Sequence, residues 1–336
     1  MRFATKQIDR LLDPLLNACG SDFLEALEIP DVEDIALNPD GMLWMKRNRQ
    51  AWSRIGTLDE TDAYAIVANV AGIKGWELHE KCPVLQTLFP LDDSRFEAVI
   101  PPITRRPVFS LRVKRANRLR LSDYAADNVL TDSGDPLNQG VTRESFIAQV
   151  KGLSHSAILC LAAQKRKTVL YVGPTGSGKT TLADAHLTEI GLLTSDRVVY
   201  IEDTPELVCD IPNSVDLLAN GDLDMLQCVR VAMRLRPTRI VVGEVRGGEA
   251  HALLKAWNTG HPGGIATVHA DDAYSGLVRM ESLVAESIST PQQRLIAAAI
   301  HLVVFIEEEP RVPAGRKVRE IIAVTGWDGR YLWERL

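Results

Sequence analysis

Short apolar runs separated by turn residues fill the first 130 residues of the chain. The runs DIAL, at 34–37, and MLWMKR, at 42–47, flank the turn residues Asn-Pro-Asp-Gly, and this arrangement predicts a hairpin. Residues 61–75 carry apolar side chains at helical spacing. Two further segments read as extended, residues 95–102 and 106–115. The pattern predicts a smaller α+β unit with a mixed or antiparallel sheet.

Near-continuous apolar runs mark the second half, which is typical of strands buried on both faces of a parallel sheet. These runs are TVLYV at 168–172, VVYIED at 198–203, RIVVGEV at 239–245, GIATVHA at 264–270 and LVVFIEE at 302–308. Helical segments lie between most of them, as parallel crossovers require. Residues 320–336 predict a closing hairpin. The stretch TDSGDPLNQGVT, at 131–142, is rich in turn residues. We therefore expect an N-terminal domain over 1–132, a linker over 133–142 and a second domain over 143–336.

Composition narrows the class of protein. An apolar share of 46% and a charged share of 24% are ordinary for a globular chain with a real core, and 336 residues suit two domains. The net charge of -6 disfavours broad binding to nucleic acid, so direct nucleic-acid binding is not expected. The five scattered cysteines form no Cys-x-x-Cys pair, which suits a reducing cytosol. The first 20 residues predict a short amphipathic helix that is too polar for an export signal, and no apolar run approaches the roughly 20 residues that span a bilayer.

The stretch GPTGSGKT fits the phosphate-binding pattern G-x-x-x-x-G-K-[ST], and it stands between a predicted strand and a predicted helix. Its glycines let successive backbone N–H groups turn toward phosphate oxygens, and the helix N-terminus adds its positive end. We expect Lys179 to reach the β- and γ-phosphates and the Thr180 hydroxyl to bind Mg²⁺. The candidate nucleotide-binding residues of the loop are Gly173, Pro174, Thr175, Gly176, Ser177, Gly178, Lys179, Thr180 and Thr181.

Carboxylates follow two of the other predicted strands. Glu244 ends the run at 239–245, where it would lie beside the phosphate-loop strand and orient an attacking water. Gly243 stands where such strands usually carry an Asp for the metal, so other carboxylates must order the metal's waters. The candidates are Glu202, Asp203 and Glu206. The alternative for Glu244 and Glu206 is an ordinary solvated charge.

Four stretches now stand in order along the chain: GPTGSGKT, VVYIEDTPEL, RIVVGEVRGGEA and TGHPGGIATVHA. Together they resemble the secretion superfamily of traffic ATPases, which power type II secretion, type IV secretion and type IV pili. The Gly-Glu ending at 243–244 is the form that this family uses. Residues 31–45 and 94–102 resemble the family's N-terminal domain. KAWNTGHPGGIATVHA and IEDTPELVC are most similar to the branch that serves conjugative transfer, and the four-cysteine zinc module typical of type II secretion is missing.

The resemblance implies a RecA-like P-loop domain with a mainly parallel sheet behind the α+β unit, and a hexameric ring that hydrolyses ATP with Mg²⁺. Nucleotide would lie in the cleft between the two domains, where Arg95 and Arg112 would clamp the γ-phosphate; the alternative is that both are ordinary strand charges. Arg105, Arg106 and Arg115 are less favoured. The implied partners are further copies of the chain and inner-membrane components of a secretion or conjugation apparatus, which places the protein in the cytoplasm at the bacterial inner membrane.

Alternative functions remain at this point. A pilus or type II secretion motor and a DNA-translocating motor share the fold, although the acidic charge and the missing basic–aromatic tract count against DNA. A small-molecule kinase would need acceptor-binding residues that the four stretches do not supply. A nucleotide-gated scaffold would not need the glutamate at 244. Arg246, two residues later, would contact a neighbouring subunit or hold the loop of that glutamate.

The stretch AWNTGHPGGIATVHA, at 256–270, places two histidines eight residues apart, which fits a metal site, a catalytic pair or a ligand-sensing loop. A zinc site is disfavoured because no further Cys or His cluster supports it. His269 ends a predicted strand at the phosphate edge and closes the motif that the resemblance identifies, so we expect it to contact the γ-phosphate or water. His261 lies in the glycine turn and would brace that loop. The sequence therefore favours a nucleotide sensor.

Overall fold

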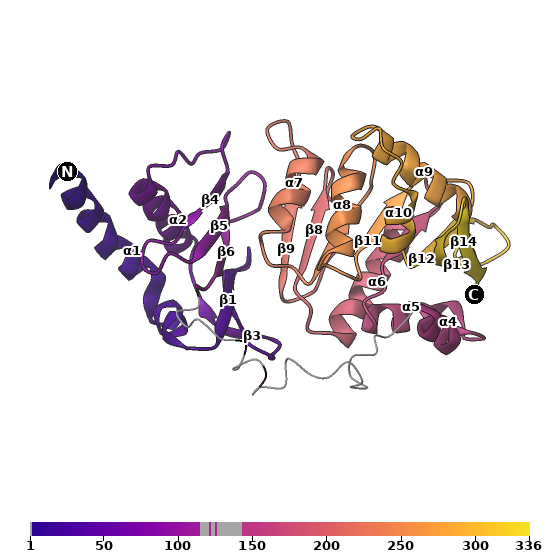
Figure 1. The fold of residues 1–336 in the computed structure, drawn as a ribbon, viewed down its shortest axis with the longest axis horizontal. Coiled ribbons are helices and arrows are strands. Elements are labelled where there is room, and N and C mark those ends of the chain that lie inside the picture. The colour runs from indigo at the N-terminus through magenta and orange to yellow at the C-terminus, as the bar shows by residue number, and fades with distance from the viewer. Residues whose placement is uncertain (1, 115–120, 122–124, 126–142) are drawn as a thin grey trace.

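The computed structural model describes residues 2–114, 121, 125 and 143–336, and no side chain is described for 2–11 or 143–145. The predicted linker at 133–142 and Arg115 lie outside the described residues. In the described part of the chain there are two separate sheets, and helices pack against each of them (Figure 1). No helix among the described residues is both long enough and apolar enough to cross a bilayer.

The first unit is a six-stranded sheet in the order β3-β2-β1-β6-β5-β4, and every neighbouring pair is antiparallel. Its strands are β1 (Val32–Leu37), β2 (Met42–Arg47), β3 (Trp52–Thr57), β4 (Val84–Leu88), β5 (Arg95–Val99) and β6 (Val108–Arg112). Helices α1 (Arg2–Glu28) and α2 (Glu60–Lys74) pack against it. The hairpin over 34–47 and the antiparallel sheet are confirmed. The N-terminal helix runs eight residues further than predicted, to Glu28, with a break at Gly20.

The second unit is an eight-stranded sheet in the order β14-β13-β12-β7-β11-β10-β8-β9. It is parallel from β12 to β9, and β13 and β14 add an antiparallel edge. Its strands are β7 (Val169–Val172), β8 (Val198–Glu202), β9 (Ser214–Leu218), β10 (Arg239–Val242), β11 (Ile265–Val268), β12 (Leu302–Glu308), β13 (Arg316–Trp327) and β14 (Tyr331–Arg335). The mainly parallel α/β fold predicted for this half is confirmed.

Helices cover both faces of this sheet, as a doubly covered parallel sheet requires. The helices are α4 (Arg143–Val150), α5 (His155–Gln164), α6 (Lys179–Leu193), α7 (Met225–Ala232), α8 (Glu249–Asn258), α9 (Ala273–Ala285) and α10 (Gln293–Ala299). Alternate residues of each strand point into the two layers. On β7, Leu170 and Val172 join the core beneath α7–α10, whereas Val169 and Tyr171 join the core beneath α4–α6.

The strand order corrects one expectation about Glu244. The strand that it follows, β10, is not the neighbour of the phosphate-loop strand, because β11 pairs with both β7 and β10 and lies between them. After β10, the chain crosses through α8 and returns into the sheet beside β7. The histidine that follows β11 is therefore the nearer neighbour of the phosphate loop.

The first unit docks on the β9 edge of the second. The backbone N–H of Leu218 donates to the carbonyl of Ile103 at 2.8 Å, which is a backbone hydrogen bond between the two units. Buried Arg197 donates to Asn38 and Asn213, and its guanidinium lies 5.5 Å from the ring of Trp52. Three apolar residues of the first unit join the core of the second: Val99, Ile103 and Val108.

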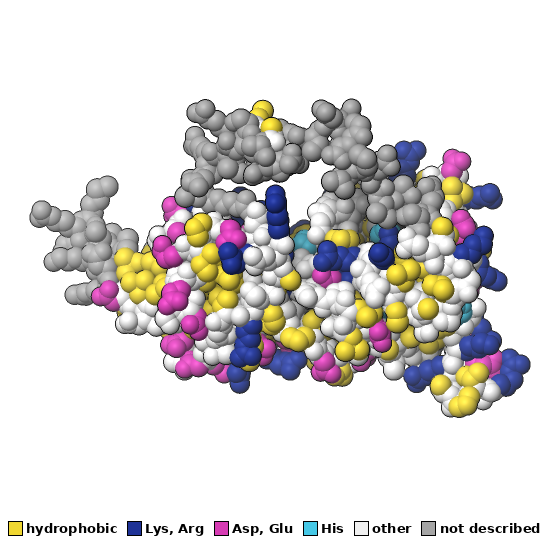
Figure 2. Space-filling view, turned by 90° about the horizontal axis from the view of Figure 1, so that it is seen from below, with side chains coloured by type: hydrophobic (Ala, Val, Ile, Leu, Met, Phe, Trp, Pro, Cys, Tyr) yellow, Lys and Arg dark blue, Asp and Glu magenta, His cyan; other side chains and the backbone are white. Residues whose placement is uncertain are grey.

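On the face drawn in Figure 2, acidic and basic side chains are interspersed.

Candidate functional site

The phosphate-binding loop connects the carboxyl end of β7 to α6, as the sequence predicts. Gly173 lies so close to β12 that an added Cβ would meet the carbonyl oxygen of Ile306 at 2.1 Å. Gly178 has a φ of +92°, a backbone conformation that side-chain-bearing residues rarely adopt. Larger residues at these positions would force the loop open. The glycines therefore fix a tight, concave turn at the N-terminus of α6.

Lys179 is the buried cation of this loop, with 6% of its surface exposed. Its Nζ donates to the carbonyls of Gly173 at 2.9 Å and Pro174 at 2.8 Å. Burial lowers the pKa of Lys179, and the negative charges of Glu244 and Glu206 oppose that shift. The ammonium is thus held inside the loop at a point where two carboxylates favour its charged form.

A hydrogen-bonded chain leads from Lys179 across the sheet edge. Lys179 Nζ lies 3.2 Å from Nδ1 of His269, and Nε2 of His269 lies 2.9 Å from Glu244. An ammonium can only donate, so Nδ1 accepts and Nε2 carries the proton that is donated to the carboxylate. Arg246 then donates to Glu244 at 2.8 Å and to Asp203. The chain follows the strand order β7, β11, β10, β8.

Glu244 stays ionised in this setting. Burial would raise its pKa, but the hydrogen bond from Arg246, the contact with His269 and the charges of Arg246 and Lys179 outweigh it, so the pKa lies below the ordinary value. Its side chain keeps 20% of its surface exposed, so one side of the carboxylate reaches solvent. Such a group can orient a water molecule without being neutralised. Arg246 holds the Glu244 loop, which was one of its two predicted roles.

The three candidate metal-water carboxylates do different things. Glu202 is buried, and its Oε1 accepts the backbone N–H groups of Glu206 and Leu207, both at 2.9 Å. A Cβ added to Gly243 would lie 3.1 Å from Cγ of Glu202. Gly243 therefore leaves space for the side chain of Glu202. Sequence reasoning missed this close approach, which depends on β8 lying next to β10 in the sheet. Asp203 is bound to Arg246, and Glu206 is exposed in the turn that Glu202 organises.

The other loop residues lie where their spacing predicts. Thr180 is half-buried in the first turn of α6, and Thr181 is exposed beside it. Ser177 is fully buried. Pro174, Thr175 and Gly176 form the exposed crest of the loop. Within the described residues, no group of three or more His, Cys, Asp or Glu side chains could hold a metal by itself.

The two histidines of the glycine-rich stretch lie at opposite ends of β11. His269 follows the carboxyl end, whereas Nδ1 of His261 lies 2.8 Å from the carbonyl of Pro237, near the amino end of β10. The four residues of β11 span about 13 Å at ~3.3 Å per residue. Gly264 lets the chain pass Trp257, whose Nε1 donates to Ile240 at 2.9 Å. The two histidines therefore do not share a site within the chain.

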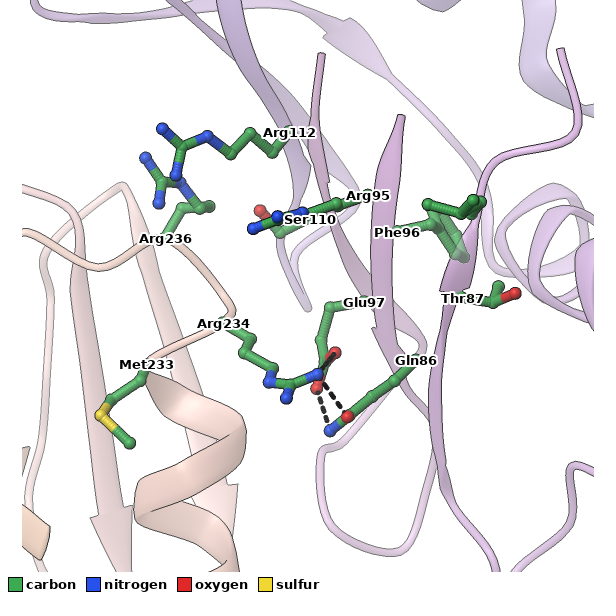
Figure 3. A pocket seen from close by; sticks show the side chains of 11 residues that line it. Gln86, Thr87, Arg95, Phe96, Glu97, Ser110, Arg112, Met233, Arg234 and Arg236 are labelled. Atoms are coloured by element: carbon green, nitrogen blue, oxygen red, sulfur yellow. Dashed lines mark hydrogen bonds and ion pairs between the residues drawn. The ribbon is translucent and has the colours of Figure 1, made fainter. Parts of the chain in front are cut away.

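The expectation that Arg95 and Arg112 clamp the γ-phosphate is not met within this chain, because neither side chain approaches the phosphate loop. They line a cavity of about 590 Å³ with Arg234 and Arg236 (Figure 3). Arg236 precedes the amino end of β10, whereas the phosphate loop follows the carboxyl end of β7. The cavity and the loop therefore lie at opposite ends of the parallel strands. An ion pair between Arg236 and Asp34, at 2.7 Å, ties the first unit to this edge.

The cavity also holds a buried carboxyl. Gln86 donates to Glu97 at 3.0 Å and accepts from Arg234 (Figure 3). Burial raises the pKa of Glu97 to about 8, against the opposing charge of Arg234. Sequence reasoning missed the arginines at 234 and 236, although the stretch MRLRPTR places them two residues apart. Of the less favoured arginines, Arg105 pairs with Asp216 and Arg106 with Glu60.

Comparisons with known proteins identify relatives of this chain. Residues 146–308 match the family described as "Type II/IV secretion system protein". The "Probable conjugal transfer protein TrbB" of Sinorhizobium fredii (strain NBRC 101917 / NGR234) is 37% identical over 324 residues, which cover 96% of this chain and 92% of that protein. The "Conjugal transfer protein TrbB" of Rhizobium radiobacter is 36% identical and covers 95% of this chain and 91% of that protein.

A solved structure agrees in fold. The crystal structure of the VirB11 ATPase from the Brucella suis type IV secretion system, in complex with sulphate, superposes with a TM-score of 0.84 at 25% sequence identity. The match covers 96% of this chain and 97% of that chain, so it includes both units. With its RecA-like second unit and its ordered phosphate-loop motifs, the chain belongs to the type II/IV secretion ATPase family, in the group that includes TrbB and VirB11.

Proposed function

We propose that this chain hydrolyses ATP to ADP and phosphate and that the reaction powers conjugative transfer by type IV secretion. The observation that carries the proposal is the chain from Lys179 through His269 to Glu244 at the carboxyl edge of the sheet. It puts a phosphate-binding cation, a neutral histidine and an ionised carboxylate within hydrogen-bond reach of one another. A nucleotide-gated scaffold would have no need for that carboxylate.

The residues of the loop fit a nucleoside triphosphate with Mg²⁺. The loop amides and Lys179 would bind the phosphates, and the Thr180 hydroxyl would bind the metal. Mg²⁺ usually keeps several waters and takes few protein ligands, which suits a site with one hydroxyl and nearby carboxylates at 202, 203 and 206. The metal would neutralise charge on the phosphates. Glu244 would position water, and His269 would hold Glu244 in register with Lys179.

Arg95 and Arg112 support the proposal that the chain works as a homohexamer. They are direct cross-strand partners on β5 and β6, and like charges in that position disfavour the sheet unless an anion lies between or near them. Within the described residues neither forms an ion pair. We propose that they clamp the γ-phosphate of nucleotide held by the loop of a neighbouring copy. We also propose the division into domains 1–132 and 143–336, joined by the linker 133–142.

The relatives support a proposal for the cellular setting. Proteins named conjugal transfer protein TrbB cover nearly the whole chain. We propose that this chain acts in the cytoplasm, attached to inner-membrane components of a conjugation apparatus and without direct binding of nucleic acid. If single-stranded DNA stimulates ATP turnover and high salt abolishes the stimulation, a DNA-translocating motor becomes the better assignment.

Two substitutions test the enzymatic proposal. Lys179→Ala should lose ATP binding, and Glu244→Gln should keep binding but lose turnover by about two orders of magnitude, as for other groups that act in the transition state. Phosphate release and fluorescent-nucleotide titration measure the two properties, and EDTA should abolish turnover in the wild type. Undiminished turnover by Glu244→Gln would remove the glutamate from this role. Complementation of a transfer-deficient strain by Glu244→Gln would contradict a hydrolysis-driven motor.

A further inference from the structure

Strand β13 also contributes a side chain to the phosphate loop. β12 pairs in parallel with β7, and β13 returns beside β12 so that Arg316, the first residue of β13, is the register partner of Glu308. A Cβ added to Gly178 would lie 2.8 Å from Cδ and 2.9 Å from an Nη atom of Arg316. The guanidinium thus rests directly against the residue that precedes Lys179.

The other arginines of this hairpin are occupied by carboxylates. Arg311 donates to Glu309 at 2.6 Å, and Arg319 donates to Glu309 at 2.8 Å and to Glu307. Arg316 is exposed and forms no ion pair within the described residues. Its five donors therefore remain available at the rim of a loop that is built to hold phosphate.

We propose that Arg316 is a further nucleotide-binding residue, which contacts the α- or β-phosphate from the hairpin side of the loop. Gly178 belongs to the part of the loop whose backbone N–H groups cradle the α- and β-phosphates. A guanidinium beside it can form the forked hydrogen bonds to phosphate oxygens that an ammonium cannot. This inference rests on the proposed function, because it needs a nucleotide in the loop.

The assignment places the contact on phosphates that ATP and ADP share. Arg316→Ala should therefore weaken the binding of ATP and of ADP alike, by about tenfold, because it removes a hydrogen bond to a charged group. Arg316→Lys should recover part of the loss through its charge. The matched control is Lys317→Ala, which removes one positive charge from the next residue on β13, whose side chain points to the other face.

The experiment titrates the full-length protein and each variant with ADP and with ATP by calorimetry, and compares their melting temperatures. Support requires a similar loss for both nucleotides in Arg316→Ala, binding within twofold of wild type in Lys317→Ala, and unchanged melting temperatures. Unchanged or tighter binding by Arg316→Ala would overturn the proposal, the latter by showing that the guanidinium obstructs the loop. Loss of ATP binding alone would also overturn it, because the contact would then be to the γ-phosphate. If the wild type binds neither nucleotide, the proposed function itself fails.

Discussion

Removing the His269 side chain separates nucleotide binding from turnover. His269 makes one hydrogen bond to the Glu244 carboxylate at 2.9 Å and accepts one from the Lys179 ammonium at 3.2 Å. A hydrogen bond to a charged group contributes roughly 1.5–3 kcal/mol. If the bond to Glu244 acts only when that carboxylate positions water, its loss slows turnover by about 10- to 100-fold, at 1.4 kcal/mol per factor of ten.

Binding should survive the same change. Lys179 keeps its hydrogen bonds to Gly173 and Pro174, so the loop geometry does not depend on His269. We expect the dissociation constant of His269→Ala for ATP to change by less than about threefold, since the neutral histidine forms only one of the hydrogen bonds to that lysine.

The matched control is His261→Ala, which deletes the same side chain at the other end of β11, where Nδ1 lies 2.8 Å from the carbonyl of Pro237. Turnover by that variant should stay within about twofold of wild type, because the contact lies a strand length from the phosphate loop. Phosphate release at saturating ATP and fluorescent-nucleotide titration compare the two variants. Wild-type turnover by His269→Ala, or a loss of binding as large as that of Lys179→Ala, would refute the reasoning.

Two further predictions concern the framework around the site. Asp196→Ala should lower the free energy of unfolding by about 3–5 kcal/mol in urea titrations. Asp196 pairs at 2.7 Å with Arg239, which is 0% exposed, so the substitution leaves a buried charge without its carboxylate partner. Asp216→Ala, which breaks a pair with exposed Arg105, should cost about 1 kcal/mol or less, and equal losses for both variants would contradict the burial argument. Burial raises the pKa of Glu97 to about 8, so the folded state holds this proton more tightly than the unfolded state. Stability should therefore fall as pH rises from about 5 to about 8, and Glu97→Gln should flatten that fall in unfolding curves; an unchanged slope would show that Glu97 is not the group responsible.

The central strands could be predicted because burial on both faces leaves no polar position to interrupt them. β7, β8, β10, β11 and β12 each read as near-continuous apolar runs. β9 escaped prediction because, as an edge strand, it alternates buried residues with half-buried Ser214 and Asp216. Its pattern is that of a strand with one covered face, and five residues are too few to distinguish it from a loop.

The geometry of the site could not be predicted as fully as its residues. Along the chain the motifs run from the phosphate loop to Glu202, Glu244 and His269, but the sheet places β11 next to β7. That strand order is decided by the connection through α8, which returns the chain to a position between β10 and β7. Similarly, the antiparallel pairing of β5 with β6 makes Arg95 and Arg112 neighbours, but the docking of the first unit decides which edge of the second sheet they face.

The strand order also connects the phosphate loop to the docked unit. The hydrogen-bonded chain that begins at Lys179 ends at Asp203, directly after β8, and β8 pairs with β9, the strand whose Leu218 holds Ile103 of the first unit. A shift of Glu244 must move Arg246 or break its bond, because both are joined within 2.8 Å. Contiguous contacts of this kind can carry coupling between distant parts of a protein. The first unit carries Arg95, so one continuous set of contacts joins the phosphate loop of a chain to the arginines that we assign to its neighbour's nucleotide.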